Sequence, residues 1–346
     1  AADAVEKANS GHPGAPMGQA DLALVLWDEF LRFDPQKPQW PGRDRFVLSC
    51  GHASMLQYAL LHLYGFGLTI DDLKAFRQWD SLTPGHPEVG HTDGVEVTTG
   101  PLGQGIANSV GMALAAKMSE ARFATDDSFN PATKNVYAIC SDGDLMEGIS
   151  AEAASLAGHW RLSNLVWLYD DNGITIDGST DLAFSENVAL RFESMGWRVL
   201  KVDGHDTLEI SSALKSARDE QQYPSLIVCK THIGYGSPNK VDTSASHGAP
   251  LGDDELAQTR KQLNWDHEPF VVPAHVRQAL EVSQQRKRAD AAHWYSEFEA
   301  WSQRHPELRR AFDASQDNTV PEGLTQALLD AVPAAGATRK LSATAI

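Results

Sequence analysis

The chain has 346 residues, 42% hydrophobic and 22% charged, a composition typical of folded globular proteins. Its formal net charge of −17 argues against a nucleic-acid-binding surface, which needs clustered lysine and arginine. No apolar run approaches the roughly 20 residues that cross a bilayer, no signal peptide is visible, and three scattered cysteines form no disulfide or metal-binding pattern, so we expect a protein of the reducing cytoplasm.

Strands and helices are predicted to alternate along the chain. Short apolar runs that end at polar or glycine residues predict strands at 44–49, 136–140, 165–169, 197–202 and 226–230. Helical patterns are predicted at 1–8, 54–63, 106–122 and 208–218, with a helical C-terminal extension from about 273 to 312. This alternation predicts an α/β fold, with a doubly wound, mostly parallel sheet and helices on both faces.

Two polar turns follow neighbouring predicted strands. Asp142-Gly143 follows the strand at 136–140, and Asn172-Gly173 follows the strand at 165–169. Parallel neighbours lie about 4.8 Å apart, so both side chains can reach one ion at the edge where α/β sheets bind ligands. Carboxylate and amide oxygens suit Mg²⁺ or Ca²⁺. Either dipeptide alone is an ordinary turn, but the pair favours a metal–diphosphate site.

Four loops rich in glycine, proline and serine each carry one histidine. These histidines are His12, His52, His86 and His247. Glycine lets the backbone approach a ligand closely, and imidazole exchanges hydrogen bonds or protons near neutral pH. Each histidine could instead only stabilise its own loop. A zinc site is a third reading, but it lacks the usual H-x-x-x-H or HExxH spacing.

The turn pair resembles the thiamine-diphosphate motif, in which Gly-Asp-Gly precedes Asn by about thirty residues. Ser141 replaces the first glycine here. Together with the histidine loops, the chain resembles transketolase over residues 1–272. The segments that carry the resemblance are, in order, SGHPGAPMG, DRFVLSCGHASM, TPGHPE, TTGPLGQGIANSVGMALA, SDG…DDNGITIDG and GSPNK…SHGAPLG.

The resemblance implies a thiamine-diphosphate-binding fold and a transferase. The expected reaction moves a two-carbon ketol unit from a ketose phosphate to an aldose phosphate, as in the pentose phosphate pathway and the Calvin cycle. The expected cofactors are thiamine diphosphate and Mg²⁺, with Ca²⁺ or Mn²⁺ as alternatives, and the expected assembly is a homodimer. Nucleic acid and membranes are not expected as partners.

The resemblance also implies a role for individual residues. The expected metal ligands are Asp142, Asn172 and the carbonyl of Ile174. The expected cofactor-binding residues are His52, Gly100, Pro101, Leu102, Gly143, Asn172 and His247. The expected substrate-binding residues are His12, His86, His247 and Arg339, and the expected catalytic residues are His12, His86, His247 and Glu147.

Glu147 and Glu152 match acidic residues that connect two active sites across the dimer in the family. The alternative, to which we give less weight, is a solvated helix start stabilised by the helix dipole.

Three segments are predicted: residues 1–272 as the cofactor-diphosphate domain, 273–332 as a helical extension and linker, and 333–346 as the start of a truncated pyrimidine-binding domain. Family members continue further, so we expect this chain alone to have little activity. Two alternatives stay open. One is a non-catalytic thiamine-diphosphate-binding module. The other is a related thiamine enzyme, such as dihydroxyacetone synthase or a ketoacid dehydrogenase component.

Overall fold

The computed structural model describes residues 1–317 and 320–346. They form two units, Ala1–Glu297 and Phe298–Ile346. The first holds the sheet, and the second is helical. No helix among the described residues combines the length and apolarity needed to cross a membrane. The three segments predicted from the sequence stay a prediction, and residues 318–319 of the second segment lie outside the described residues.

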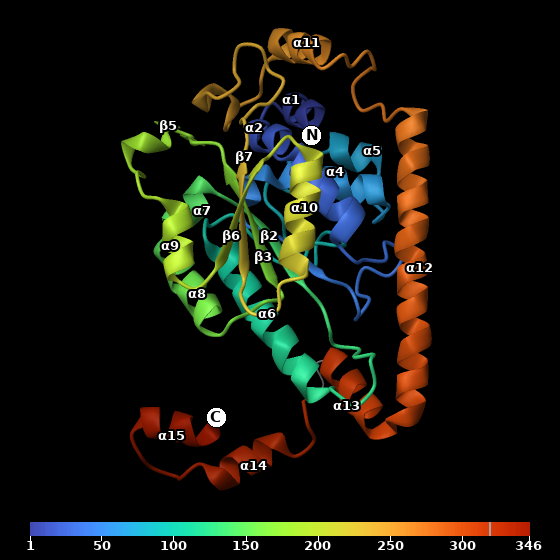
Figure 1. Cartoon of the computed structure of the whole chain (residues 1–346), viewed down its shortest axis with the longest axis vertical. Coiled ribbons are helices and arrows are strands. Elements are labelled where there is room, and N and C mark those ends of the chain that lie inside the picture. The colour runs from blue at the N-terminus through green and yellow to red at the C-terminus, as the bar shows by residue number, and fades with distance from the viewer. Residues whose placement is uncertain (318–319) are drawn as a thin grey trace. The chain divides into compact units, whose positions relative to one another are not determined.

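The first unit is built on a five-stranded sheet with strand order β1-β2-β3-β7-β6 (Figure 1). The strands are β1 (Arg45–Leu48), β2 (Val136–Ser141), β3 (Leu165–Asp171), β6 (Arg198–Asp203) and β7 (Ser225–Lys230). Every pair in this sheet is parallel. A short antiparallel hairpin, β4 (Ile174–Thr175) with β5 (Gly178–Ser179), follows β3. The predicted α/β class with a mostly parallel sheet is confirmed.

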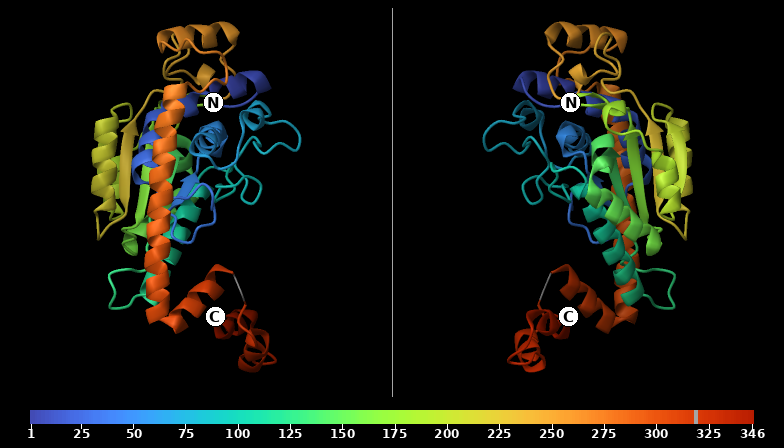
Figure 2. Two further views of the ribbon diagram at one scale, coloured as in Figure 1. Left: turned by 90° about the vertical axis from the view of Figure 1, so that its right-hand side faces the viewer. Right: turned by 90° about the vertical axis from the view of Figure 1, so that its left-hand side faces the viewer.

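Helices lie on both sides of this sheet (Figure 2). The helices of the first unit are α1 (Ala2–Ala8), α2 (Gly14–Gly18), α3 (Ala20–Val25), α4 (Ser54–Tyr64), α5 (Ile70–Lys74), α6 (Gln104–Arg122), α7 (Asp142–Met146), α8 (Gly148–His159), α9 (Val188–Ser194), α10 (Thr207–Arg218) and α11 (Asp253–Gln262). Helix α12 (Ala274–Arg304) continues through the unit boundary. The second unit also contains α13 (Pro306–Gln316), α14 (Leu324–Ala331) and α15 (Thr338–Ala345).

Strand β2 is buried on both faces, which explains its unbroken apolar sequence. Tyr137 and Ile139 lie in a core shared with residues of α4 and α10. Ala138 and Cys140 lie in a second core with residues of α6 and α8. Because successive side chains of a strand point to opposite faces, one strand supplies both cores. The loops that leave its carboxyl end therefore start from a rigid position.

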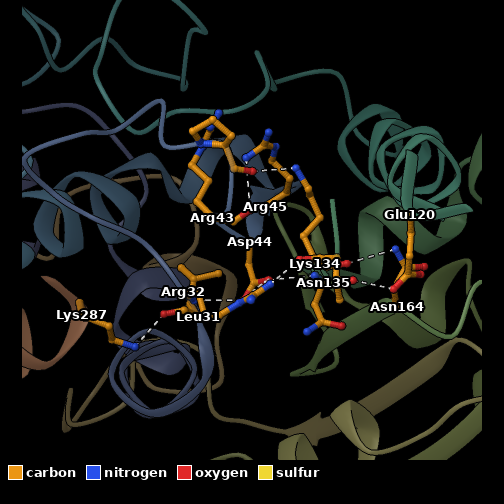
Figure 3. A network of polar contacts seen from close by, with 12 residues as sticks. Leu31, Arg32, Arg43, Asp44, Arg45, Glu120, Lys134, Asn135, Asn164 and Lys287 are labelled. Atoms are coloured by element: carbon orange, nitrogen blue, oxygen red, sulfur yellow. Dashed lines mark hydrogen bonds and ion pairs between the residues drawn. The ribbon is translucent and has the colours of Figure 1, made fainter. Parts of the chain in front are cut away.

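A polar network ties together the amino ends of β1 and β2 (Figure 3). Asp44, which precedes β1, accepts hydrogen bonds from Arg32 Nη2 at 2.9 Å and from the backbone N–H of Asn135 at 2.8 Å. Lys134 Nζ donates to the carbonyl oxygen of Pro41 at 2.9 Å. These contacts hold the register of the two strands at the end opposite to the predicted metal site.

Candidate functional site

The two predicted metal-binding turns lie beside each other at the carboxyl edge of the sheet. Strands β2 and β3 are direct neighbours, with Ser141 aligned to Asp170. Asp142 begins α7, and its Oδ2 accepts a hydrogen bond from the Gly173 backbone N–H at 3.2 Å. Asn172 Oδ1 accepts from the Ile174 N–H at 2.9 Å. The predicted proximity of these turns is therefore seen in the fold, since one hydrogen bond joins them.

The environment of the Asp142 carboxyl group favours binding of a cation. Its side chain is buried, and burial is the main cause that raises its pKa to about 7. The nearby carboxylates of Asp170 and Asp171 raise it further, while the Tyr169 hydroxyl and the Gly173 N–H, both donating to Asp142, oppose the shift. A divalent cation at this edge would offset both burial and repulsion.

Three of the four predicted histidines are in ring contact. The centroids of His12 and His52 lie 5.1 Å apart, those of His52 and His247 lie 5.1 Å apart, and those of His12 and His247 lie 5.8 Å apart. The fourth, His86, lies close enough to lower the pKa of His12 and His52, and it packs beside Gly100. Loops far apart in the sequence thus bring their imidazoles into one cluster.

The imidazoles of this cluster are neutral at pH 7. Burial lowers the pKa of His12 to about 4, and its neighbours His247, Arg77 and His86 lower it further. Burial, followed by His247 and His12, lowers the pKa of His52 to about 3. Burial also lowers the pKa of His86 and of His247. Neutral rings have one donor and one acceptor nitrogen, which suits exchange of hydrogen bonds with hydroxyl groups.

Glycines bring three loops together beside Asp142. A Cβ added at Gly51 would lie 2.7 Å from the backbone nitrogen of Gly100, and one added at Gly143 would lie 2.9 Å from Cδ1 of Leu102. These loops therefore meet only because the side chains are missing, which leaves backbone available to a ligand. Across the described residues, Nδ1 of His247 is among the few buried polar atoms without a partner, so this region can still bind polar groups.

Comparison with known proteins shows the family of the chain. The family model "Transketolase, thiamine diphosphate binding domain" matches residues 1–321. The chain belongs to the transketolase family. The family resemblance predicted from the sequence motifs is confirmed.

The chain is similar to transketolases over almost its whole length. It is 49% identical to transketolase 1 of Escherichia coli over 351 residues, which cover 99% of this chain and 53% of that protein. It is 51% identical to the transketolase of Geobacillus stearothermophilus, covering 93% of this chain and 48% of that one. The solved transketolase of Leishmania mexicana matches with a TM-score of 0.94 and 42% identity, over 99% of this chain and 51% of that one. The chain thus spans about half the length of these relatives.

Glu147, Glu152 and Arg339 are the remaining residues expected from the transketolase resemblance. Glu147, at the junction of α7 and α8, and Glu152 are exposed. Arg339 lies in α15 of the second unit. Their roles stay predictions. Among the residues that the structure describes, no three His, Cys, Asp or Glu side chains are grouped as metal ligands, so the geometry gives no support to a histidine-zinc site.

Sequence reasoning missed a buried carboxylate behind the expected metal ligand. Asp170 is 1% exposed and accepts hydrogen bonds from Gln19 Nε2 at 2.6 Å, from Asn172 Nδ2 at 2.9 Å and from the Thr231 hydroxyl. Because the amide nitrogen of Asn172 is held by Asp170, its oxygen is the atom that can face a cation. The only signal in the sequence was the Asp170-Asp171 pair directly before Asn172.

Arg77 is a second residue that the motifs did not reveal. Its Nη1 donates to Ser10 Oγ at 2.9 Å, and its Nη2 lies 3.5 Å from Nδ1 of His12. A guanidinium group only donates, so Nδ1 of the neutral His12 ring acts as acceptor and Nε2 carries the proton. Arg77 therefore selects the tautomer of His12.

Replacing Arg77 by methionine is expected to release this selection. The variant keeps the length of the side chain but removes the donor, so His12 should populate both neutral tautomers. Long-range ¹H–¹⁵N NMR spectra of the imidazoles measure the change, and Arg161→Met, an exposed arginine, is the control. An unchanged single tautomer in Arg77→Met would contradict the assignment.

Proposed function

We propose that this chain supplies the diphosphate- and metal-binding half of a transketolase active site. The reaction is the thiamine-diphosphate-dependent transfer of a two-carbon ketol unit from a ketose phosphate to an aldose phosphate. The proposal is carried by the buried carboxyl of Asp142, which accepts a hydrogen bond from the Asn172-Gly173 turn, together with three neutral imidazoles in ring contact. Family membership supports the same conclusion.

The metal ligands in this proposal are the carboxylate of Asp142, the amide oxygen of Asn172 and the carbonyl oxygen of Ile174. Three hard oxygen donors leave positions open for diphosphate oxygens, and they suit Mg²⁺, with Ca²⁺ or Mn²⁺ as substitutes. Gly143 and the 100–102 loop would contact the cofactor where the glycines let the chain approach closely. Bound thiamine diphosphate supplies the electron sink that breaks the carbon–carbon bond.

The histidines would bind the substrate's polar end and hold its protons. His12, His86 and His247 are proposed to exchange hydrogen bonds with the ketol oxygens, and His52 and His247 to contact the cofactor. With the tautomer set by Arg77, Nε2–H of His12 is a donor, which suits an oxygen that gains negative charge. Arg339 is proposed to bind substrate phosphate.

The partners in this proposal are sugar phosphates and a second copy of the chain. A mutant transketolase of Pichia stipitis has been solved with fructose 6-phosphate, and transketolase of the same organism with sedoheptulose 7-phosphate, which supports this substrate class. Glu147 and Glu152 are proposed to connect the two sites of a homodimer, and the compartment is proposed to be the cytoplasm. Residues 1–272 are proposed as the diphosphate domain, 273–332 as its extension and linker, and 333–346 as the start of the pyrimidine domain.

Titration of the chain with thiamine diphosphate, with and without Mg²⁺, tests the proposal. We expect saturable binding by calorimetry that requires the metal. Product analysis with xylulose 5-phosphate and ribose 5-phosphate then measures ketol transfer, for which we expect little activity in the isolated chain. Absence of metal-dependent binding would overturn the proposal in favour of a non-catalytic module. Robust transfer by the isolated chain would contradict the expected need for further domains.

A further inference from the structure

Ser141, the residue that departs from the family motif, is part of a local hydrogen-bond network. Ser141, which stands where the motif has glycine, directly precedes Asp142. Its backbone N–H donates to Asp144 Oδ2 at 3.0 Å, and its hydroxyl donates to the same oxygen at 3.2 Å. The Ser141 and Asp144 side chains thus form a capping box at the start of α7, in which the serine pairs with the carboxylate three residues later.

The other oxygen of Asp144 reaches two more loops. Oδ1 accepts a hydrogen bond from Ser49 Oγ at 2.7 Å and another from the backbone N–H of Gly103 at 2.8 Å. Ser49 follows β1 and leads into the loop of His52. Gly103 follows the 100–102 segment. Each donor therefore belongs to a loop that carries a residue proposed to contact the cofactor.

Asp144 itself is fully buried, with 0% of its surface exposed. A buried carboxylate is costly unless its oxygens are well paired, and four N–H or O–H groups meet that requirement here. Two of these donors belong to Ser141, the last residue of β2, and the other two belong to Ser49 and Gly103, in loops near the proposed diphosphate site. The carboxylate therefore fixes the spacing between these loops.

We propose that Asp144 is a positioning residue, which holds the loops at Ser49–His52, Gly100–Gly103 and Ser141–Gly143 in the spacing that the cofactor diphosphate needs. This inference rests on the proposed function and deepens it. Ser141 belongs to the same hydrogen-bond network, because its hydroxyl donates to Asp144. Glycine at this position would lack that donor. Asp144 acts only through these loops and touches no substrate.

Asp144→Asn replaces one acceptor oxygen by a donor without changing the size of the side chain. We expect its affinity for thiamine diphosphate with Mg²⁺ to fall about 10- to 100-fold, the range for residues that orient metal ligands through hydrogen bonds. Ser49→Ala and Ser141→Gly each remove a single hydrogen-bond donor to Asp144, and each should lower this affinity less than Asp144→Asn does. Calorimetry on the 346-residue chain measures these affinities, and amide hydrogen exchange should rise at Gly103 but not in β7.

Asp44→Asn is the matched control. Asp44 is also buried and multiply hydrogen-bonded, but it serves the amino ends of β1 and β2 (Figure 3), so its loss should lower the melting temperature and leave the affinity unchanged. If the wild-type chain shows no metal-dependent binding, the proposed function fails. If it binds and the Asp144 and Ser49 variants bind equally well, only the positioning role fails. Should Asp144→Asn not fold, the Ser49 and Ser141 variants decide the question.

Discussion

Asp142→Ala is expected to abolish metal-dependent binding of thiamine diphosphate. The substitution removes the only carboxylate from a proposed ligand set that otherwise holds neutral oxygens, so the cation loses its charged partner. Loss of such a ligand should exceed the 10- to 100-fold effect of an outer-shell partner, so we expect a fall of at least about 100-fold. Calorimetric titration with Mg²⁺ and the cofactor measures it. Asp177→Ala, an exposed acid in the following turn, should bind normally.

Asp142→Ala should also remove one contribution to the pH dependence of the folding stability of the ligand-free chain. The folded-state pKa of Asp142 is about 7, above its ordinary value of 3.8, so the folded state binds a proton that the unfolded state releases. This contribution is fully present below about pH 4 and is lost as pH rises toward 7. Denaturant unfolding of Asp142→Ala should therefore show a smaller loss of stability over that range. Retained metal-dependent binding in this variant would refute the metal assignment.

His52→Gln is expected to reduce the acid sensitivity of the fold. The folded-state pKa of His52 is about 3, against 6.5 for an ordinary histidine. The unfolded chain therefore takes up a proton that the folded chain does not. The contribution of His52 to folding stability is fully present above about pH 6.5 and is lost as pH falls toward 3. With about 1.4 kcal/mol for each pKa unit, and with the ring partly open to solvent, we expect a contribution of about 2 to 4 kcal/mol.

Denaturant unfolding between pH 4 and 7 would measure this difference in the slope of stability against pH. His159→Gln, at an exposed position on α8, is the matched control and should follow the wild-type slope. Because Asp142 and the histidines shift stability in opposite directions over this range, Asp142→Ala should be more acid-sensitive than the wild type. Parallel slopes for wild type and His52→Gln would show that the ring protonates freely in the folded state.

The sequence predicted the parts of the fold that depend on local signals. The strands at 136–140 and 165–169 are predicted because each is an apolar run closed by a polar turn, and the structure extends them to Ser141 and Asp171. Their adjacency follows from the single crossover between them. The position of β7 between β3 and β6 has no such local signal, since β6 comes first in the chain. It depends on which strand buries more apolar surface.

The same distinction separates the predicted from the missed site residues. Histidines in glycine-rich loops are visible in a sequence because an unusual residue stands in an unusual setting. Gln19 lies in the turn between α2 and α3, and its bond to Asp170 joins positions 151 residues apart, so only the folded chain reveals it. The contact between Asp144 and Ser49 is missed for the same reason, because the two residues are 95 positions apart, with α4, α5, α6 and β2 between them.

The neutral state of the imidazole cluster has a consequence for how an anion reaches it. The chain carries a net charge of −17, and the three contacting rings add no positive charge to counter it. Long-range attraction of a free diphosphate toward this edge is therefore weak, whereas its chelate with a divalent ion carries less charge and is repelled less. For the proposed site we therefore expect the ion to come first or to travel with the diphosphate.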